Sequence, residues 1–313
     1  MTVQAEQRPG TGLEAAPRPE DVSVETPFRR FVSDFLESRI ATVALAVFAV
    51  IAFIALFAPW IAPTDPYDLA QVSVLDSHMP PGSTAFDGRV FVLGTDGAGR
   101  DLLSAIFYGL RISLGVGVMS GIIAMAIGSV VGLAAAYFGG RVDTVIMRIV
   151  DIQLSFPSIL VALVLLAVLG KGVDKILIAL ITVQWAYYAR TVRASALVER
   201  SKEYIDAATC LALGHRRILF RHLLPNCLPP LIVVVTVQTA HAIALEATLS
   251  FLGIGLPITE PSLGLLIANG FEYMLSMKYW ISVYPGVALL ITIVSINLVG
   301  DQLRDVLNPR LQK

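Results

Sequence analysis

Six long apolar stretches dominate this chain of 313 residues. A hydrocarbon core roughly 30 Å thick is crossed by about 20 helical residues, and each stretch is long enough. Hydrophobic residues make up 56% of the chain, charged residues only 15%, and the mean hydropathy is +0.73, which is too apolar for a soluble domain. We therefore predict an all-α integral membrane protein with transmembrane helices at residues 40–62, 112–138, 144–169, 176–195, 228–251 and 279–300.

The third and fourth stretches carry charges that the cleanest stretches lack. Arg148 and Asp151 open the third, and Arg190 lies within the fourth. Such cations can lie at the cytoplasmic ends of tilted helices and extend to the interface, which costs far less than burial at the membrane centre. Pro157 should kink the third helix, because a proline cannot bond the backbone carbonyl one turn earlier. The kink can be a static feature of the helix bundle or a moving hinge, and both interpretations remain open.

Basic residues predict the orientation of the chain in the membrane. If the amino terminus is cytoplasmic, the internal segments hold 17 Lys and Arg residues and the external segments hold 6. This bias places both termini and an insert at 196–225 inside, and a loop at 63–110 outside. The first apolar run is too long for a signal peptide and has no cleavage pattern after it. Residues 1–38 form a cytoplasmic segment that we expect to be disordered to about residue 25.

The cytoplasmic insert contains a basic amphipathic stretch, EYIDAATCLALGHRRILFRHLLP, at residues 203–225. Its pattern predicts two short helices. Gly214 is expected to end the first in a left-handed conformation, so that a β-branched residue there would cost roughly 1 to 2 kcal/mol. Pro225 is expected to end the second. An ordinary amphipathic loop on the membrane surface is the alternative interpretation.

The order of residues in the insert resembles the EAA signature of permease subunits in bacterial ATP-binding-cassette (ABC) importers. Asp206-Ala207-Ala208 occupies the position of the EAA triplet, with aspartate where glutamate is usual. A glycine, an isoleucine and a Leu-Pro pair follow at the spacing that the family shows. The resemblance implies that the insert docks into a groove of an ATPase subunit. The implied coupling residues are Glu203, Tyr204, Asp206, Ala207, Ala208, Leu213, Gly214, Ile218, Leu224 and Pro225.

The end of the external loop is rich in glycine and charge. It lacks a GK[ST] end and a preceding strand, so it is not a nucleotide-binding loop. The run from Val92 resembles the LGTDxxGRD signature of permeases in dipeptide, oligopeptide and nickel importers. We expect Arg100 to pair with Asp101, and Ser104 and Arg111 to form hydrogen bonds at the membrane boundary. The motif residues are Gly94, Asp96, Gly99, Arg100 and Asp101.

Three further features lie in the apolar stretches or at their ends. Two GxxxG patterns in the second stretch predict a close helix contact, inside one bundle or between two permease chains. Glu246 lies in a segment that resembles the family's EAxLSFLGLG, and for it we favour a structural or gating role over proton coupling. The carboxyl end resembles the family's GDxLRDxLDPR, where Asp301, Arg304 and Asp305 are spaced to pair. The packing or gating candidates are Gly117, Gly121, Gly128, Gly132, Pro157 and Glu246.

Several site types find no support in the sequence. The histidines do not form a metal-binding set, and Cys210 and Cys227 are expected to be free thiols. The resemblance implies a permease without its own ATPase motifs or cofactor, with ATP and Mg²⁺ bound by partner subunits. It also implies a type I importer fold: one extra helix at 39–62, a five-helix core at 111–303 and a cytoplasmic tail at 304–313.

The resemblance identifies the C-type permease subunit of a dipeptide or oligopeptide importer. Its implied partners are a B-type permease, two ATPase subunits, an extracytoplasmic binding protein, the peptide substrate and membrane lipid, with no nucleic acid. The implied location is the bacterial inner membrane. A secondary transporter driven by an ion gradient and a membrane scaffold are the rival classes, and nickel chelates or glutathione-like molecules remain open as substrates.

Overall fold

The structure is almost wholly helical. The computed structural model describes residues 27–68, 72–85, 88–257 and 259–307, so most of the segment predicted to be disordered lies outside the described residues. The α-helices are α1 (Pro27–Glu37), α2 (Arg39–Ile61), α3 (Leu102–Phe138), α4 (Gly140–Ser155), α5 (Ser158–Leu169), α6 (Val173–Arg200), α7 (Glu203–Cys210), α8 (His215–Arg217), α9 (Leu224–Phe251), α10 (Leu263–Phe271) and α11 (Trp280–Leu307). The short elements are η1 (Val74–Asp76), β1 (Ser83–Thr84), β2 (Val90–Phe91), the π-helical η2 (Ile218–Leu223) and η3 (Met274–Ser276).

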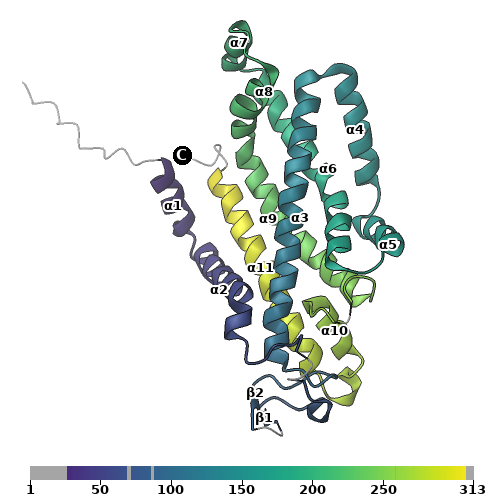
Figure 1. The fold of residues 1–313 in the computed structure, drawn as a ribbon. Coiled ribbons are helices and arrows are strands. Elements are labelled where there is room, and N and C mark those ends of the chain that lie inside the picture. Colours follow the sequence, from purple (N-terminus) through teal and green to yellow (C-terminus); the bar gives the residue numbers. More distant parts are fainter. Residues whose placement is uncertain (1–26, 69–71, 86–87, 258, 308–313) are drawn as a thin grey trace, which may run out of the picture.

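The long helices run side by side, and α3 lies among them (Figure 1). It packs against α2, α6 and α9, while α11 packs against α2 and α9. The antiparallel pair β1–β2 lies at one end of the bundle, and α7 and α8 lie at the other. The external loop and the insert, which the charge distribution predicts on opposite sides of the membrane, are therefore at opposite ends of the protein.

Among the described residues, four helices are long and apolar enough to cross a membrane: α2, α3, α11 and the continuous helix from His215 to Phe251. The pair α4 and α5 would add a fifth span if the two count as one. Helix α6 is 28 residues long but does not meet the same criteria, because the half that leads to α7 is rich in charged residues. The spans predicted at 40–62, 112–138, 228–251 and 279–300 are thus found, whereas the total of six stays a prediction.

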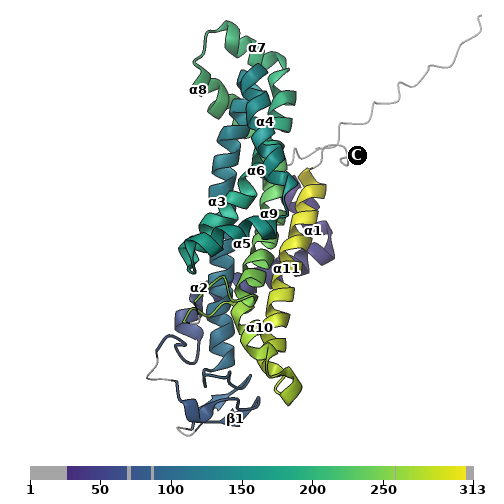
Figure 2. The same cartoon turned by 90° about the vertical axis from the view of Figure 1, so that its right-hand side faces the viewer.

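The third predicted span is broken rather than kinked. Phe156 leaves the helical conformation after α4, and Pro157 becomes the N-cap residue of α5. The axes of α4 and α5 meet at 89°, and α5 lies crosswise to the long helices about halfway along the bundle (Figure 2). The residue before a proline is biased toward extended conformations, which explains why the helix ends at Ser155.

Other predicted boundaries also move. Helix α3 begins at Leu102, so residues 102–110 belong to a helix and not to the external loop. Pro225 does not end the second helix of the insert, because α8, η2 and α9 continue into one another through it. Pro225 cannot donate the regular backbone hydrogen bond, and the π-helical turn of η2, where the regular pattern of backbone bonds is already interrupted, directly precedes it. The short helix α10 has no counterpart among the predicted elements.

The first GxxxG pattern packs inside the chain's own bundle. A methyl group added at Gly117 would lie 2.6 Å from a side-chain carbon of Ile243, and one at Gly121 would lie 3.3 Å from the hydroxyl of Thr239. Both neighbours belong to α9. Small residues therefore let α3 and α9 approach closely in the half of the bundle nearer the external loop.

The second pattern packs against another helix. A methyl group at Gly128 would lie 2.5 Å from the carbonyl oxygen of Trp185, and one at Gly132 would lie 2.4 Å from that of Ala189. These contacts involve the backbone of α6, which cannot move aside as a side chain can. Two alternatives were open for these glycines, packing inside one bundle or between two permease chains. In the structure, all four pack against helices of the same chain.

Candidate functional site

Helix α7 of the insert has one face attached to the protein and one face open. Ile205 and Ala208 are buried in a cluster that includes Val192 of α6 and Leu223 of η2. Asp206 is exposed, as are Glu203, Tyr204 and Ala207. Of the EAA-like triplet, the second alanine thus anchors the helix, whereas the acid and the first alanine face outward.

The turn after α7 differs from its prediction. Ala212, and not Gly214, takes the left-handed conformation, with φ of 52°. The N–H of Leu213 bonds the carbonyl of Ala208 at 3.2 Å, which closes the last turn as in a Schellman motif. Gly214 has φ of −60° and ψ of 143°, which any residue can adopt. The predicted strain for a β-branched residue at Gly214 is therefore wrong.

We expect Ala212→Gly to stabilise this turn, because glycine pays no steric cost in the left-handed region while alanine pays roughly 1 kcal/mol. Hydrogen exchange at the Leu213 amide should slow by a few fold in the assembled protein. Gly214→Ala is the matched control and should leave that amide unchanged. Equal or faster exchange in Ala212→Gly would contradict the assignment of strain to residue 212.

The second half of the insert, α8 and η2, continues directly into α9. Ile218 and Leu223 are buried in the same cluster as α7, while Leu224 is half-buried and Pro225 exposed. Leu213, between the two halves, also packs on this cluster. Helix α7 therefore packs against a helix that continues as a candidate membrane span.

Polar contacts that the sequence did not reveal hold the base of α7. The hydroxyl of Tyr204 donates to Glu199 at 2.8 Å, and the amide of Asn226 donates to the same hydroxyl at 3.2 Å. Burial, followed by the hydrogen bond to Glu199, raises the pKa of Tyr204 to about 12. Lys202 pairs with Glu199 at 2.6 Å. Tyr204 therefore stays neutral at physiological pH and links the ends of α6 and α9 to α7.

The tip of the insert presents an apolar and basic surface. Leu211 is 74% exposed and Phe220 is 48% exposed. Arg216, Arg217 and Arg221, in the same segment, are also exposed. Exposed apolar side chains and cations in one short segment are suited to a protein groove with an apolar floor and acidic rim.

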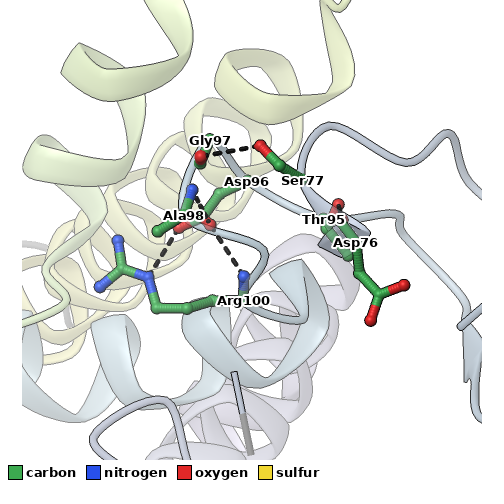
Figure 3. Close-up of polar contacts among 7 residues, drawn as sticks. All are labelled: Asp76, Ser77, Thr95, Asp96, Gly97, Ala98 and Arg100. Carbon is green, nitrogen blue, oxygen red and sulfur yellow. Dashed lines mark hydrogen bonds and ion pairs between the residues drawn. The ribbon is translucent and has the colours of Figure 1, made fainter. Parts of the chain in front are cut away.

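The external loop is held by a compact network around Asp96 (Figure 3). Its carboxylate accepts hydrogen bonds from the backbone of Ala98 and Arg100, and pairs with the Arg100 guanidinium at 2.7 Å. The hydroxyl of Thr95 donates to the carbonyl of Asp76 at 2.6 Å and ties the motif to η1. The partner of Arg100 is thus Asp96, and the predicted pair with Asp101 is wrong.

Glycines in the loop allow its segments to touch. Gly94 and Gly99 both have φ of +83°, and a methyl group at Gly99 would lie 2.1 Å from the carbonyl oxygen of Ser73. The glycine density that might suggest phosphate binding is therefore explained by tight turns and backbone contacts.

Asp101 caps α3 instead of pairing with arginine. Its carboxylate accepts the backbone N–H of Ser104 at 2.9 Å and also the Ser104 hydroxyl. Thr64, at the end of α2, donates to that hydroxyl at 3.1 Å from its backbone N–H. Ser104 therefore does form hydrogen bonds, as predicted, and joins the segment after α2 to the start of α3.

Replacing Asp101 with alanine should destabilise the protein by about 0.5 to 2 kcal/mol, because the first turn of α3 loses its side-chain cap. Thermal unfolding of the purified protein in detergent would measure this loss. Asp101→Asn keeps a side-chain oxygen for the cap and should retain most of the stability. An unchanged midpoint in Asp101→Ala would show that the cap contributes nothing.

Glu246 is fully buried among hydroxyl groups. Ser113 of α3 donates to one carboxylate oxygen at 2.9 Å, and Ser250, one turn further along α9, donates to the other at 2.7 Å. Ser262, the N-cap of α10, is a third hydroxyl in hydrogen-bond contact. The carboxylate thus joins α3, α9 and the start of α10, an arrangement that the lone acid in the sequence did not reveal.

Three other features concern possible metal ligands, the cysteines and the charged residues of α11. Over the described ranges, no group of three His, Cys, Asp or Glu side chains is placed to hold a metal ion. Cys210 is exposed, Cys227 is buried, and both are free. Asp301, Arg304 and Asp305 form no ion pair with one another within the described part of α11, so the pairing predicted for them is wrong.

Comparisons with known proteins agree with this geometry. Residues 117–313 match the family model for the inner membrane component of binding-protein-dependent transport systems. Residues 26–81 match the model for the N-terminal transmembrane domain of oligopeptide transport permease C. A chain in structures of the inward-facing MetNI methionine ABC transporter shares the fold, with a TM-score of 0.53 and 21% identity over 66% of this chain and 98% of that chain.

Curated relatives match over nearly their whole length. A protein of Brucella suis named as a peptide transport system permease is 40% identical, over 88% of this chain and 90% of its own. The di/tripeptide permease DppC of Pseudomonas aeruginosa is 37% identical, over 92% and 93%. The dipeptide permease DppC of Escherichia coli K12 is 39% identical, over 92% and 95%. With most of its length matched by relatives above 30% identity, the chain belongs to the family of inner-membrane components of binding-protein-dependent transport systems.

Proposed function

We propose that this protein is a permease subunit of an ATP-driven importer of dipeptides or short oligopeptides. The names of its relatives support the substrate class. The observation that carries the mechanism is the insert, where α7 is anchored by Ile205 and Ala208 and exposes Asp206 and Ala207. The chain forms the translocation pathway with a second, B-type permease, receives substrate from an extracytoplasmic binding protein and contacts membrane lipid.

The insert couples ATP hydrolysis to movement of the spans. Two cytoplasmic ATPase subunits bind ATP and Mg²⁺, and one of them receives α7 in a groove. Ala207 allows close approach, Asp206 makes a polar contact, and Leu211 and Phe220 add apolar contact. Because α8, η2 and α9 form one continuous helix, movement of α7 is transmitted to a membrane span and biases the equilibrium between inward-open and outward-open states.

The orientation follows the predicted charge bias, with both termini and the insert in the cytoplasm. The protein then lies in the bacterial inner membrane as a multi-pass subunit that hydrolyses no ATP by itself.

Reconstitution of the copurified assembly tests the function. Proteoliposomes should hold ATP inside, with a labelled dipeptide and the binding protein outside. We expect uptake that depends on both ATP and the binding protein. Uptake that needs an ion gradient and no ATP would instead support a secondary transporter, and an assembly that localises partners without any uptake would support a scaffold.

A further inference from the structure

One face of α9 is left uncovered between Val237 and Thr248. Val237 is 45% exposed, and His241 and Thr248 are also exposed, while Ala244 between them is half-buried. These positions recur at helical spacing and form a single stripe. The opposite side of the helix, with Ala242 and Ile243, is fully buried. The stripe must therefore face something other than this chain.

The polar members of the stripe argue against lipid. His241 lies near the middle of the span predicted at 228–251, and its Nε2 lies 3.4 Å from the hydroxyl of Ser158, at the start of α5. Ionisable groups inside membrane spans face a bundle interior or a water-filled cavity, because hydrocarbon cannot solvate them. By contrast, the open groove between α2 and α11, which includes Val43, Leu290 and Val294, is apolar along nearly its whole length and suits lipid.

The stripe continues toward the cytoplasm into a cleft of about 790 Å³ between α6, α9 and α11. Its size falls within the range of small-molecule sites, roughly 300 to 1,000 Å³. Gln238 lines this cleft, and the oxygen of its side-chain amide is buried and has no hydrogen-bond partner among the described residues. A buried amide oxygen without a partner is costly, so a group that can donate a hydrogen bond is expected there.

We propose that His241 and Gln238 line the substrate pathway and contact the backbone of the transported peptide. This inference rests on the proposed function. The amide oxygen of Gln238 accepts a hydrogen bond from a peptide N–H or terminal ammonium, and the imidazole of His241, beside the Ser158 hydroxyl, bonds a peptide carbonyl or the terminal carboxylate. Contacts to backbone groups would bind dipeptides of many sequences.

Cysteine labelling tests whether the stripe is solvated. His241→Cys would be made in a chain that also carries Cys210→Ser and Cys227→Ala, and the full assembly would react with a charged, membrane-impermeant thiol reagent applied from either side. We expect labelling in at least one nucleotide state, and slower labelling when a saturating dipeptide is present. Val294→Cys, on the apolar face of α11, is the matched control and should stay unlabelled. No labelling of residue 241 in any state would overturn the proposal.

Transport kinetics provide the second test. His241→Leu should raise the KM for dipeptide uptake at least tenfold at saturating binding protein, while His241→Gln, which keeps hydrogen-bonding groups, should retain a KM within about threefold of wild type. Unchanged uptake by His241→Leu would overturn the role of His241, provided that the wild-type assembly transports dipeptide. If the wild type transports no peptide at all, the proposed function itself has failed. If residue 241 is labelled at the same rate with and without saturating dipeptide, a contact between this residue and the substrate is contradicted.

Discussion

Gly128→Ala should destabilise the protein by about 1 to 3 kcal/mol or more, although it adds only one methyl group. That methyl would lie 2.5 Å from the carbonyl oxygen of Trp185 and 2.8 Å from the backbone nitrogen of Ala189. Overpacking of this size forces helices apart, and the obstacle here is the backbone of α6, which has no rotamer to change. Thermal unfolding followed by tryptophan fluorescence would report the loss.

The same helix supplies the control. Gly115 lies in α3 as well, and a methyl group there would meet nothing within 4 Å. Gly115→Ala should be neutral or stabilising, because alanine has the higher helix propensity. If the two variants unfold at the same temperature, the contact between α3 and α6 is looser than the structure indicates.

Glu246→Ala should cost several kcal/mol, since it leaves buried hydroxyl groups without their acceptor. Ser113, Ser250 and Ser262 are each at most 1% exposed, so water cannot replace the carboxylate. Each buried polar group left unsatisfied costs about 1 to 3 kcal/mol. The loss should loosen the packing of α3, α9 and α10 at the end of the bundle nearer the external loop, and appear as a lower unfolding midpoint of the purified assembly.

Thr248→Ala is the matched control on the same helix. Thr248 is exposed, and its hydroxyl donates to the carbonyl of Ala244 at 2.8 Å, its one hydrogen bond among the described residues, so its removal should shift the midpoint little. Glu246→Gln should lie between the two, because the amide can accept one hydroxyl but presents a donor to the other. Equal stability of Glu246→Ala and Thr248→Ala would contradict a structural role for the carboxylate.

Hydropathy predicted the spans well where the burial of apolar side chains alone decides whether a segment forms a membrane helix. At α2, α3, α9 and α11, about 20 apolar residues in a row leave few alternatives to a membrane helix. A kink was predicted at Pro157, and the helix is broken there instead, because the sequence shows that a proline disfavours the helix and cannot show how the following helix packs. Helix α10 was missed, since it is only nine residues long and lies within a short connection.

Side-chain partners could not be predicted from spacing. Arg100 lies next to Asp101 in sequence, but the Asp101 carboxylate caps α3. The arginine pairs instead with Asp96, four residues earlier in the loop. Gly214 was assigned the left-handed conformation by its residue type, whereas the helix had already ended and Ala212 takes that conformation. The hydroxyls around Glu246 come from three segments, and only the fold brings them together.

The resemblance of the insert to the EAA signature implied docking roles for both Ala207 and Ala208, whereas the structure buries Ala208 in the chain's own core. The structure also changes what Gly214 can be expected to do. A side chain at Gly214 would meet nothing within 4 Å in this chain, and the backbone there suits any residue. A requirement for glycine at this position would therefore come from a partner that approaches closely. This makes Gly214→Asp a test of docking that leaves the fold of the subunit intact.

The most direct measurement is uptake together with ATPase activity in proteoliposomes that carry Gly214→Asp, Gly214→Ala or the wild-type chain in the copurified assembly. For Gly214→Asp, we expect dipeptide uptake and the ATPase activity stimulated by binding protein to be lost together, by at least tenfold, while the subunits still copurify and the unfolding midpoint is unchanged. Gly214→Ala should retain most of both activities. Wild-type uptake and ATPase activity in the Gly214→Asp assembly would contradict a coupling role for the insert.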